Sequence, residues 1–209
     1  MKNLPGTQTA PSKIVCVGRN YADHAKELGN AVPSAPLLFL KAPSAITYDG
    51  NPIVLPDQSH QVEHEAELAV VISKTCKRLS GADNVADFIA GYACLNDVTA
   101  RDIQRSDVQF TRAKSFDTFC PIGPLVQTDC DTSDVRIQCR VNGDVRQDSR
   151  TSQMVFSVDF LIRYISNQMT LMPGDIIATG TPGGVSRLSP GDICEVEIEG
   201  MGILSNPVI

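Results

Sequence analysis

Three glutamates, Glu63, Glu65 and Glu67, alternate with other residues just before an apolar run at residues 68–72. This run contains valines and an isoleucine, so residues 62–73 are predicted to form a strand that enters the core. Side chains alternate faces along a strand, which puts the three glutamates on one face. Carboxylates near a low-dielectric core repel one another unless a cation or a proton relieves them. A divalent metal is the simplest such cation, and a solvated acidic face is the alternative.

A second acidic ladder, Glu195, Glu197 and Glu199, begins in a predicted strand at residues 193–198. No other functional signal accompanies this ladder, and we interpret it as a solvated face. Alternation of glutamates is therefore not enough to indicate a metal site, and other residues must support the first ladder.

His24 and Glu27 lie three residues apart in a predicted helix at residues 21–28, for which Asn20 is the expected N-cap. Residues three apart are neighbours on one helical face, so the imidazole can reach the carboxylate. Such a pair could act as a general base with its orienting acid. A simple surface contact on an exposed helix is the alternative.

Further acidic and polar residues follow a strand predicted at residues 91–97. Asp97 ends that strand and could join the Glu65 and Glu67 face as a hard oxygen ligand. Asp102 could do the same, or it could cap the helical turn that begins near Thr99. Arg101 and Gln104 are expected on one side of that turn.

Lys114 precedes a segment that becomes steadily more apolar toward two prolines. Beside carboxylates this lysine would stay protonated and could bind an anion or stabilise an oxyanion, with solvent exposure as the alternative. The glycine-rich loop around Thr181 lacks the lysine and following helix of a Walker-type loop. It can still present backbone N–H groups and the Thr181 hydroxyl to an anion.

The remaining pattern predicts a mixed α/β, β-rich fold. Asn142 and Gly143 have the residue types of a two-residue hairpin turn. We expect residues 1–12 to be a loose lead-in and residues 13–209 to form a single domain, which the length of 209 residues suits. Further strands are predicted at residues 13–17, 37–41, 53–55 and 135–141 and from 145 onward, and further helices at 84–90 and 154–169.

Composition argues against several classes of function. The net charge is −6, which does not favour a nucleic-acid surface. No segment approaches the roughly 20 apolar residues of a membrane span. Seven scattered cysteines without a C-x-x-C pair indicate neither a disulfide framework nor a zinc site. We therefore expect a cytoplasmic protein that binds neither nucleic acid nor membrane.

Five motifs in order along the chain make the sequence resemble the fumarylacetoacetate hydrolase superfamily, and its small acylpyruvase-type or fumarylpyruvate hydrolase-type members in particular. They are GRNYADH at 18–24, HEAELAVVI at 64–72, NDVTARD at 96–102, KSFDT at 114–118 and TGTP at 179–182. Each motif alone is a weak signal, and their order makes coincidence improbable. The resemblance runs from about residue 13 to the end of the sequence.

The resemblance implies a β-roll or β-sandwich core with short peripheral helices, usually in a homodimer. It also implies a Mg²⁺ or Mn²⁺ ion held by Glu65, Glu67 and Asp97, while Glu63 receives no role. His24 and Glu27 would form a water-activating dyad on a lid-like helix, with Lys114 supporting the developing charge. The implied substrate-binding residues are Arg19, Arg101, Gln104 and Thr181.

This set of residues suits a substrate that is a 2-oxo acid. Activated water would cleave the C–C bond of an acylpyruvate or fumarylpyruvate, giving pyruvate and a carboxylic acid, because the leaving carbanion is a stabilised enolate. Oxaloacetate decarboxylation or tautomerisation could use the same site. The alternatives are an isomerase or hydratase of 2-hydroxymuconate-type diacids in aromatic catabolism, and a non-catalytic interaction protein with a structural ion.

Overall fold

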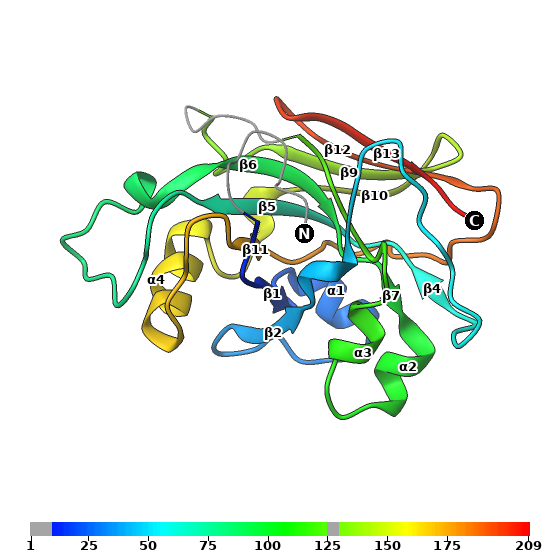
Figure 1. Cartoon of the computed structure of the whole chain (residues 1–209), viewed down its shortest axis with the longest axis horizontal. Coiled ribbons are helices and arrows are strands. Elements are labelled where there is room, and N and C mark those ends of the chain that lie inside the picture. The colour runs from blue at the N-terminus through cyan, green and yellow to red at the C-terminus, as the bar shows by residue number, and fades with distance from the viewer. Residues whose placement is uncertain (1–9, 125–129) are drawn as a thin grey trace.

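Three β-sheets dominate the fold of the residues that the structure describes, 10–124 and 130–209 of a computed structural model (Figure 1). The largest sheet has the order β2-β1-β11-β5-β6-β8-β3, with strands Leu37–Lys41, Ile14–Gly18, Ile176–Ala178, Ala66–Ile72, Ile89–Asn96, Cys120–Ile122 and Ile46–Tyr48. The second has the order β10-β9-β12-β13, with strands Asp144–Arg150, Arg136–Val141, Ile193–Ile198 and Gly202–Pro207. The third pairs β4, Val62–Glu63, with β7, Thr99–Ala100.

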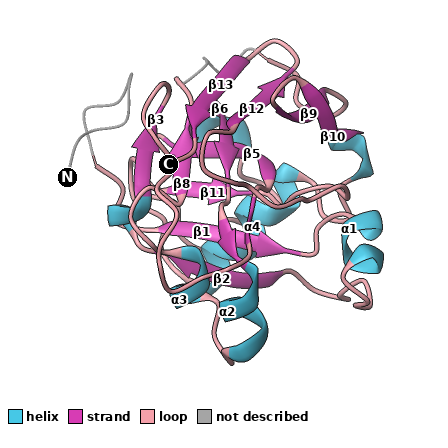
Figure 2. Ribbon diagram, turned by 90° about the vertical axis from the view of Figure 1, so that its right-hand side faces the viewer, coloured by secondary structure: helices cyan, strands magenta, loops and turns pink. Residues whose placement is uncertain are grey.

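The helices are short. They are α1 at Ala22–Glu27, α2 at Arg101–Ser106, α3 at Thr111–Lys114 and α4 at Val158–Gln168, with 3-10 turns at Pro43–Ala45, Val85–Phe88 and Thr151–Gln153. Helices α2 and α3 lie near β1 and β2, on the side of the molecule away from the β9-β10-β12-β13 sheet (Figure 2). Strand-rich content with few helices confirms the fold class expected from the sequence. Among the described helices, none is long and apolar enough to cross a membrane.

The centre of the large sheet is the antiparallel pair β5 and β6. Every residue of β5 is buried, and the pairing runs from Ala66 opposite Asn96 to Ile72 opposite Ile89. Since β5 begins where β6 ends, the residues just before Ala66 and just after Asn96 meet at one end of the sheet. This register brings Glu65 next to Asp97, and the Asp97 N–H donates to the Glu65 carbonyl at 2.8 Å.

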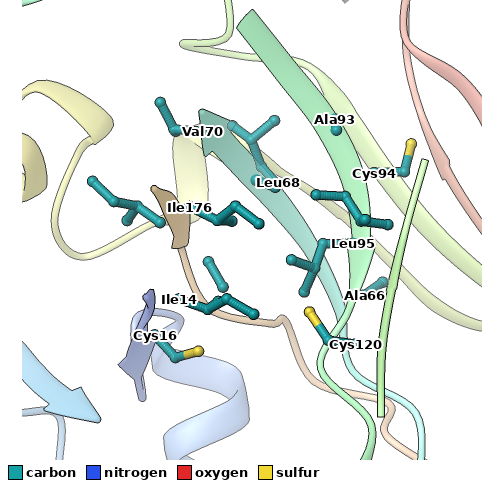
Figure 3. Close-up of a cluster of buried hydrophobic side chains, with 14 of the residues drawn as sticks. Ile14, Cys16, Ala66, Leu68, Val70, Ala93, Cys94, Leu95, Cys120 and Ile176 are labelled. Carbon is teal, nitrogen blue, oxygen red and sulfur yellow. The ribbon is translucent and has the colours of Figure 1, made fainter. Parts of the chain in front are cut away.

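The core lies between the two larger sheets and around β5. Figure 3 shows five of the core side chains, Ile14, Leu68, Leu95, Cys120 and Ile176, and the register of the large sheet puts Leu68 on the opposite face from Leu95 and Ile176. All five side chains are fully buried, and each large aliphatic side chain contributes about 1.5–3 kcal/mol by leaving water. All seven cysteines are free in the structure.

The second sheet contains the predicted hairpin. Asn142 and Gly143 link β9 to β10 with φ angles of 55° and 85°. A type I′ turn requires positive φ at both central residues, and these two residue types accept it. The predicted strands at 135–141 and from 145 onward are therefore confirmed as β9 and β10.

Several predicted elements differ from the structure. The strand predicted at 62–73 is interrupted at residues 64–65, because Val62 and Glu63 pair with β7 rather than with the large sheet. Residues 53–55 contribute only an isolated bridge through Ile53, and the helix predicted at 84–90 is a 3-10 turn. The strand predicted at 37–41 forms as β2, an edge strand that is partly exposed.

Helix α4 is shorter than the prediction of 154–169. It begins after Ser157, whose hydroxyl accepts the Phe160 N–H, as an N-cap does. Phe160 is 45% exposed, and its ring stacks on Phe156 and Tyr164 at centroid distances of 5.4 and 6.0 Å.

Candidate active site

Three buried carboxylates converge where β5 begins and β6 ends. Glu65, Glu67 and Asp97 each have a carboxylate oxygen within 4.8 Å of the others, and their exposures are 4%, 2% and 0%. Glu65 precedes β5, Glu67 lies within it, and Asp97 follows β6. The antiparallel register described above accounts for this convergence. A cluster of hard carboxylate oxygens is the donor set that Mg²⁺ and Mn²⁺ prefer, so the cluster could bind such a metal.

Two buried lysines neutralise part of this cluster. Lys114 Nζ lies 2.7 Å from Glu65 Oε2 and 2.7 Å from Asp97 Oδ2, and Lys41 Nζ donates to Asp97 Oδ1 and to the Val98 carbonyl. Burial acts to lower the pKa of Lys114, but the attraction of Asp97 and Glu65 outweighs it and raises that pKa to about 12. Lys114 is therefore a charged ammonium, and its 2% exposure excludes the alternative of a solvent-exposed lysine.

Arg101 joins the cluster from the first turn of α2. Its Nε lies 2.8 Å from Glu63 Oε2, its Nη2 lies 2.6 Å from Glu65 Oε1, and its Nη1 lies 2.6 Å from Gln104 Oε1. Burial acts to raise the pKa of Glu65, but Lys114 and Arg101 together hold that pKa well below its ordinary value. Glu63 thus has a partner in the site, although the family resemblance implied no role for it.

Glu67 differs from its neighbours because no described cation contacts it. Its Oε2 accepts the Gly180 N–H at 2.8 Å. Gly180 has φ of +102°, and a Cβ there would come within 2.7 Å of Asn20, so only glycine brings this N–H so close. Burial, with the nearby charges of Asp97 and Glu65, raises the pKa of Glu67 well above its ordinary value.

The charges of the cluster leave room for a divalent cation. Four carboxylates, including Glu63, face the three cations Lys41, Arg101 and Lys114, which leaves one negative charge in a buried region. Only an ionised Glu67 would carry this charge, and its raised pKa favours the protonated form because it lacks a cationic partner in the described part of the chain. A metal ion there would stabilise the ionised form of Glu67 and would make the site as a whole positive.

His24 and Glu27 face each other on α1. His24 Nδ1 lies 3.3 Å from Glu27 Oε2, and His24 is only 5% exposed. The Gly184 N–H donates to both Glu27 oxygens, at 3.1 and 3.2 Å, which fixes the carboxylate. Because a carboxylate only accepts hydrogen bonds, Nδ1 carries the hydrogen and Nε2 of a neutral ring keeps its lone pair.

A cavity of about 420 Å³ brings nearly all of the predicted site residues together. It is lined by Arg19, His24, Glu27, Glu65, Glu67, Arg101, Gln104, Lys114 and Thr181, with Val17, Gly18, Leu28, Asn30, Leu37, Phe39, Arg105 and Phe110 completing its wall. Asp97 does not line the cavity, because it is fully buried beneath Lys114 and Lys41. The predicted base, the predicted ligands Glu65 and Glu67, and the predicted substrate-binding residues therefore share one space.

Four polar residues of this region were not predicted in the positions they take. Asn20, the expected helix cap, is instead buried and holds the Thr179 and Phe156 carbonyls through Nδ2. Gln147 donates to Thr181 Oγ1 at 2.7 Å and accepts the Ala66 N–H. Asn96 accepts the Glu65 N–H, and Lys41 holds Asp97. Of these four residues, only Lys41 had a signal in the sequence, because a lysine at the end of an apolar strand is unusual.

Asp102 is not the cap of the turn that the sequence offered as an alternative to metal binding, because α2 has Ala100 at its N-cap and Asp102 lies within its first turn. Its carboxylate accepts from Ser59 Oγ, the His60 N–H and the Ile103 N–H. These bonds fasten the start of α2 to the loop before β4. Asp102 is therefore a structural anchor that lies outside the three-carboxylate cluster.

A family model described as fumarylacetoacetate (FAA) hydrolase, C-terminal, matches residues 13–209. The chain belongs to the fumarylacetoacetate hydrolase family. The resemblance that five short motifs indicated is thus confirmed, and the chain is an enzyme of this family. The mitochondrial oxaloacetate tautomerase FAHD2A of Bos taurus is 46% identical over 213 residues, covering 96% of this chain and 68% of that protein.

Solved structures of the family share the fold. A 5-carboxymethyl-2-hydroxymuconate delta-isomerase from Mycobacterium smegmatis is 49% identical with a TM-score of 0.89, covering 96% of this chain and 79% of that chain. A 2-hydroxyhepta-2,4-diene-1,7-dioate isomerase from Mycobacterium marinum is 47% identical with a TM-score of 0.88, covering 96% and 75%. The β-rich fold expected for the fumarylacetoacetate hydrolase family is therefore confirmed.

Proposed function

We propose that this chain interconverts the keto and enol forms of a 2-oxo acid, with Mg²⁺ or Mn²⁺ as cofactor. The observation that carries the proposal is the shared cavity, in which His24 and Glu27 face the carboxylates Glu65 and Glu67. A base beside a metal-binding cluster suits removal of a proton from the carbon next to a keto group. The oxaloacetate tautomerase named among the relatives supports this reaction class.

Glu65, Glu67 and Asp97 would hold the metal, whose chemical contribution when bound is Lewis acidity toward the keto oxygen of the substrate. His24 Nε2 accepts the proton from the neighbouring carbon, and the electron pair of that C–H bond moves toward the keto oxygen. Glu27 stabilises the imidazolium through Nδ1. Return of the proton from His24 to the oxygen completes the change to the enol, with no atom gained or lost.

Lys114 has a further part in this reaction. An ammonium has three N–H donors, and Glu65 and Asp97 occupy two of them. Lys114 also lines the cavity, so its third N–H is available to the developing oxyanion. Because Lys114 remains charged, it supplies this donor without a proton transfer of its own.

C–C hydrolysis of acylpyruvates or fumarylpyruvate is the second candidate, and the same His24–Glu27 pair supports it. In this reaction His24 takes a proton from water, and the water oxygen adds to the distal carbonyl carbon. The C–C bond then breaks, its electron pair stays with the pyruvate fragment, and the proton goes to that carbon. Isomerisation of 2-hydroxymuconate-type diacids is an alternative that the two isomerases among the solved structures support.

Purified protein should be tested with oxaloacetate, acetylpyruvate and one 2-hydroxymuconate-type diacid, in Mn²⁺ or Mg²⁺ and then in EDTA. We expect enol–keto exchange of oxaloacetate that EDTA abolishes and that His24→Ala reduces by ~100-fold or more. Pyruvate release from acetylpyruvate at a higher kcat/KM would favour the hydrolase. Full activity in EDTA would exclude a role for the metal in the reaction.

The homodimer and the cytoplasmic location remain predictions. Light scattering after size-exclusion chromatography tests whether the protein is a homodimer.

A further inference from the structure

Gln147 is the one fully buried residue of β10. The other residues of this edge strand are exposed or partly exposed. The pairing of β10 with β9 shifts between Val145 and Gln147, so that Arg146 is an extra residue and the strand carries a bulge. Bulges bend a strand and redirect its side chains, often beside active sites. This bulge turns a polar side chain from an exposed edge into the interior.

Two backbone partners fix the orientation of the Gln147 amide. Its Oε1 accepts the Ala66 N–H at 3.0 Å, and its Nε2 donates to the Pro182 carbonyl at 2.8 Å. A backbone N–H only donates and a carbonyl only accepts, so the amide cannot be turned round. Oε1 also lies 3.0 Å from His64 Nδ1, which therefore carries a hydrogen, and His64 Nε2 accepts from Ser186 Oγ at 2.8 Å.

The second hydrogen on Nε2 sets the direction of the Thr181 hydroxyl. Nε2 lies 2.7 Å from Thr181 Oγ1. An amide nitrogen donates and does not accept, so Oγ1 is the acceptor in this bond. Thr181 lines the cavity, and among the residues that the structure describes none accepts a hydrogen bond from its hydroxyl. The hydroxyl hydrogen is therefore available to a molecule in the cavity.

The oxygen end of the same amide supports the carboxylate cluster. Ala66, whose N–H it accepts, lies between Glu65 and Glu67, two of the three carboxylates that could hold a metal. The bond thus fixes the peptide segment that sets the spacing of these two side chains. Groups that orient metal ligands in this way contribute strongly to metal affinity.

We propose that Gln147 is a positioning residue that acts through both ends of its amide. The oxygen fixes the segment between Glu65 and Glu67, and the nitrogen turns the Thr181 hydroxyl toward the substrate as a hydrogen-bond donor. The second part rests on the proposed function. In the proposed reaction Lys114 and the metal serve the keto oxygen, which leaves the carboxylate of the 2-oxo acid as the acceptor for Thr181. A carboxylate keeps its charge throughout the reaction, so this bond affects KM more than kcat.

Two substitutions of Gln147 separate the two ends. Gln147→Glu keeps an oxygen that can accept the Ala66 N–H. A carboxyl group carries at most one hydrogen, so it cannot donate to both Pro182 and Thr181. Gln147→Met has a similar length and neither donates nor accepts. Gln168→Glu and Gln168→Met are the matched controls, because Gln168 is exposed at the end of α4 and does not line the cavity.

Isothermal titration with Mn²⁺ tests the oxygen end without any reaction. We expect Gln147→Met to weaken Mn²⁺ binding by roughly 10-fold and Gln147→Glu to change it by less than about 3-fold. Circular dichroism during heating checks that the variants fold. If Gln147→Met does not fold, Gln147→Asn replaces it, because an amide one methylene shorter cannot reach both Ala66 and Pro182. Unchanged Mn²⁺ affinity in the folded variant would overturn this part of the inference.

Kinetics with oxaloacetate test the nitrogen end. Gln147→Glu should raise KM by roughly 10-fold and change kcat by less than about 3-fold. Thr181→Val should have a similar effect, and the double variant should lose little more, because both changes remove the same bond. A wild-type KM in Gln147→Glu, or losses that add in the double variant, would overturn this part and leave the proposed function intact. A wild-type protein inactive toward oxaloacetate would overturn the proposed tautomerisation, and the role of Thr181 with it, whereas the Mn²⁺ titration would still decide the oxygen end.

Discussion

Lys114 and Glu65 form a buried ion pair, with Nζ 2.7 Å from Oε2, and the same ammonium lies 2.7 Å from Asp97 Oδ2. The lysine thus bridges two of the three carboxylates that could hold a metal. The third, Glu67, accepts one backbone N–H and has no described cationic partner. Because of this asymmetry, we expect substitutions at positions 67 and 114 to change the stability of the metal-free protein in opposite directions.

Glu67→Gln should stabilise the metal-free protein by about 1–2 kcal/mol, because a buried carboxylate without a cation is replaced by a neutral amide that can still accept the Gly180 N–H. The variant should also lose the stabilisation that wild type gains from Mn²⁺. Urea unfolding in EDTA and in Mn²⁺ measures both effects. As a control, Glu199→Gln in the solvent-facing ladder should change stability by less than about 0.5 kcal/mol. A less stable Glu67→Gln variant in EDTA would contradict our account of the charges.

Lys114→Met should destabilise the metal-free protein by about 3–5 kcal/mol, because it leaves Glu65 and Asp97 without their shared buried cation. Mn²⁺ should recover much of this loss, since a divalent ion can compensate the same carboxylates. Thermal unfolding followed by circular dichroism, with EDTA or with Mn²⁺, provides the measurement. If Mn²⁺ stabilises wild type but not this variant, Lys114 is needed to shape the metal site as well as to balance its charge.

Local patterns predicted the parts of the molecule whose partners lie nearby in sequence. Asn142 and Gly143 predicted a hairpin because turn geometry depends on two residues, and His24 and Glu27 predicted a contact because a helix fixes their spacing. Lys41 and Gln147 could not be found in this way. Lys41 reaches Asp97 across 56 residues and Gln147 reaches Ala66 across 81, so both contacts depend on the order of strands in the sheets.

The break in the strand predicted at 62–73 explains why the contacts of Glu63 could not be predicted from its position in the sequence. Strict alternation along one strand placed it on the same face as Glu65 and Glu67, and the family resemblance gave it no role. The break at residues 64–65 moves Glu63 into pairing with β7. Its carboxylate then meets Arg101, which a pattern confined to one strand could not indicate.

Glu63→Gln should weaken Mn²⁺ binding by roughly 10-fold, the usual effect of removing a group that orients a metal ligand. Without the charge of Glu63, Arg101 interacts more strongly with Glu65 and competes with the metal for that carboxylate. Isothermal titration with Mn²⁺ measures the change, and Glu199→Gln is again the control. Unchanged Mn²⁺ affinity, in a variant that folds normally, would show that Arg101 holds Glu65 without help from Glu63.

Asp175→Asn should cost about 2 kcal/mol of stability at pH 7, because buried Asp175 accepts bonds from Ser12, Lys13 and Met172. Burial acts to raise the pKa of Asp175, but these donors, led by Lys13, hold it below its ordinary value of 3.8. A lowered pKa in the folded state means that this stabilisation is present above about pH 4 and is lost as pH falls through the folded pKa. Urea unfolding from pH 7 to pH 3 should therefore show wild type approaching the variant in acid. Asp144→Asn, at an exposed position, is the control and should have nearly the stability of wild type at every pH. If the loss of stability in Asp175→Asn stays constant with pH, the shape of the Asp175 side chain, rather than its charge, determines its contribution.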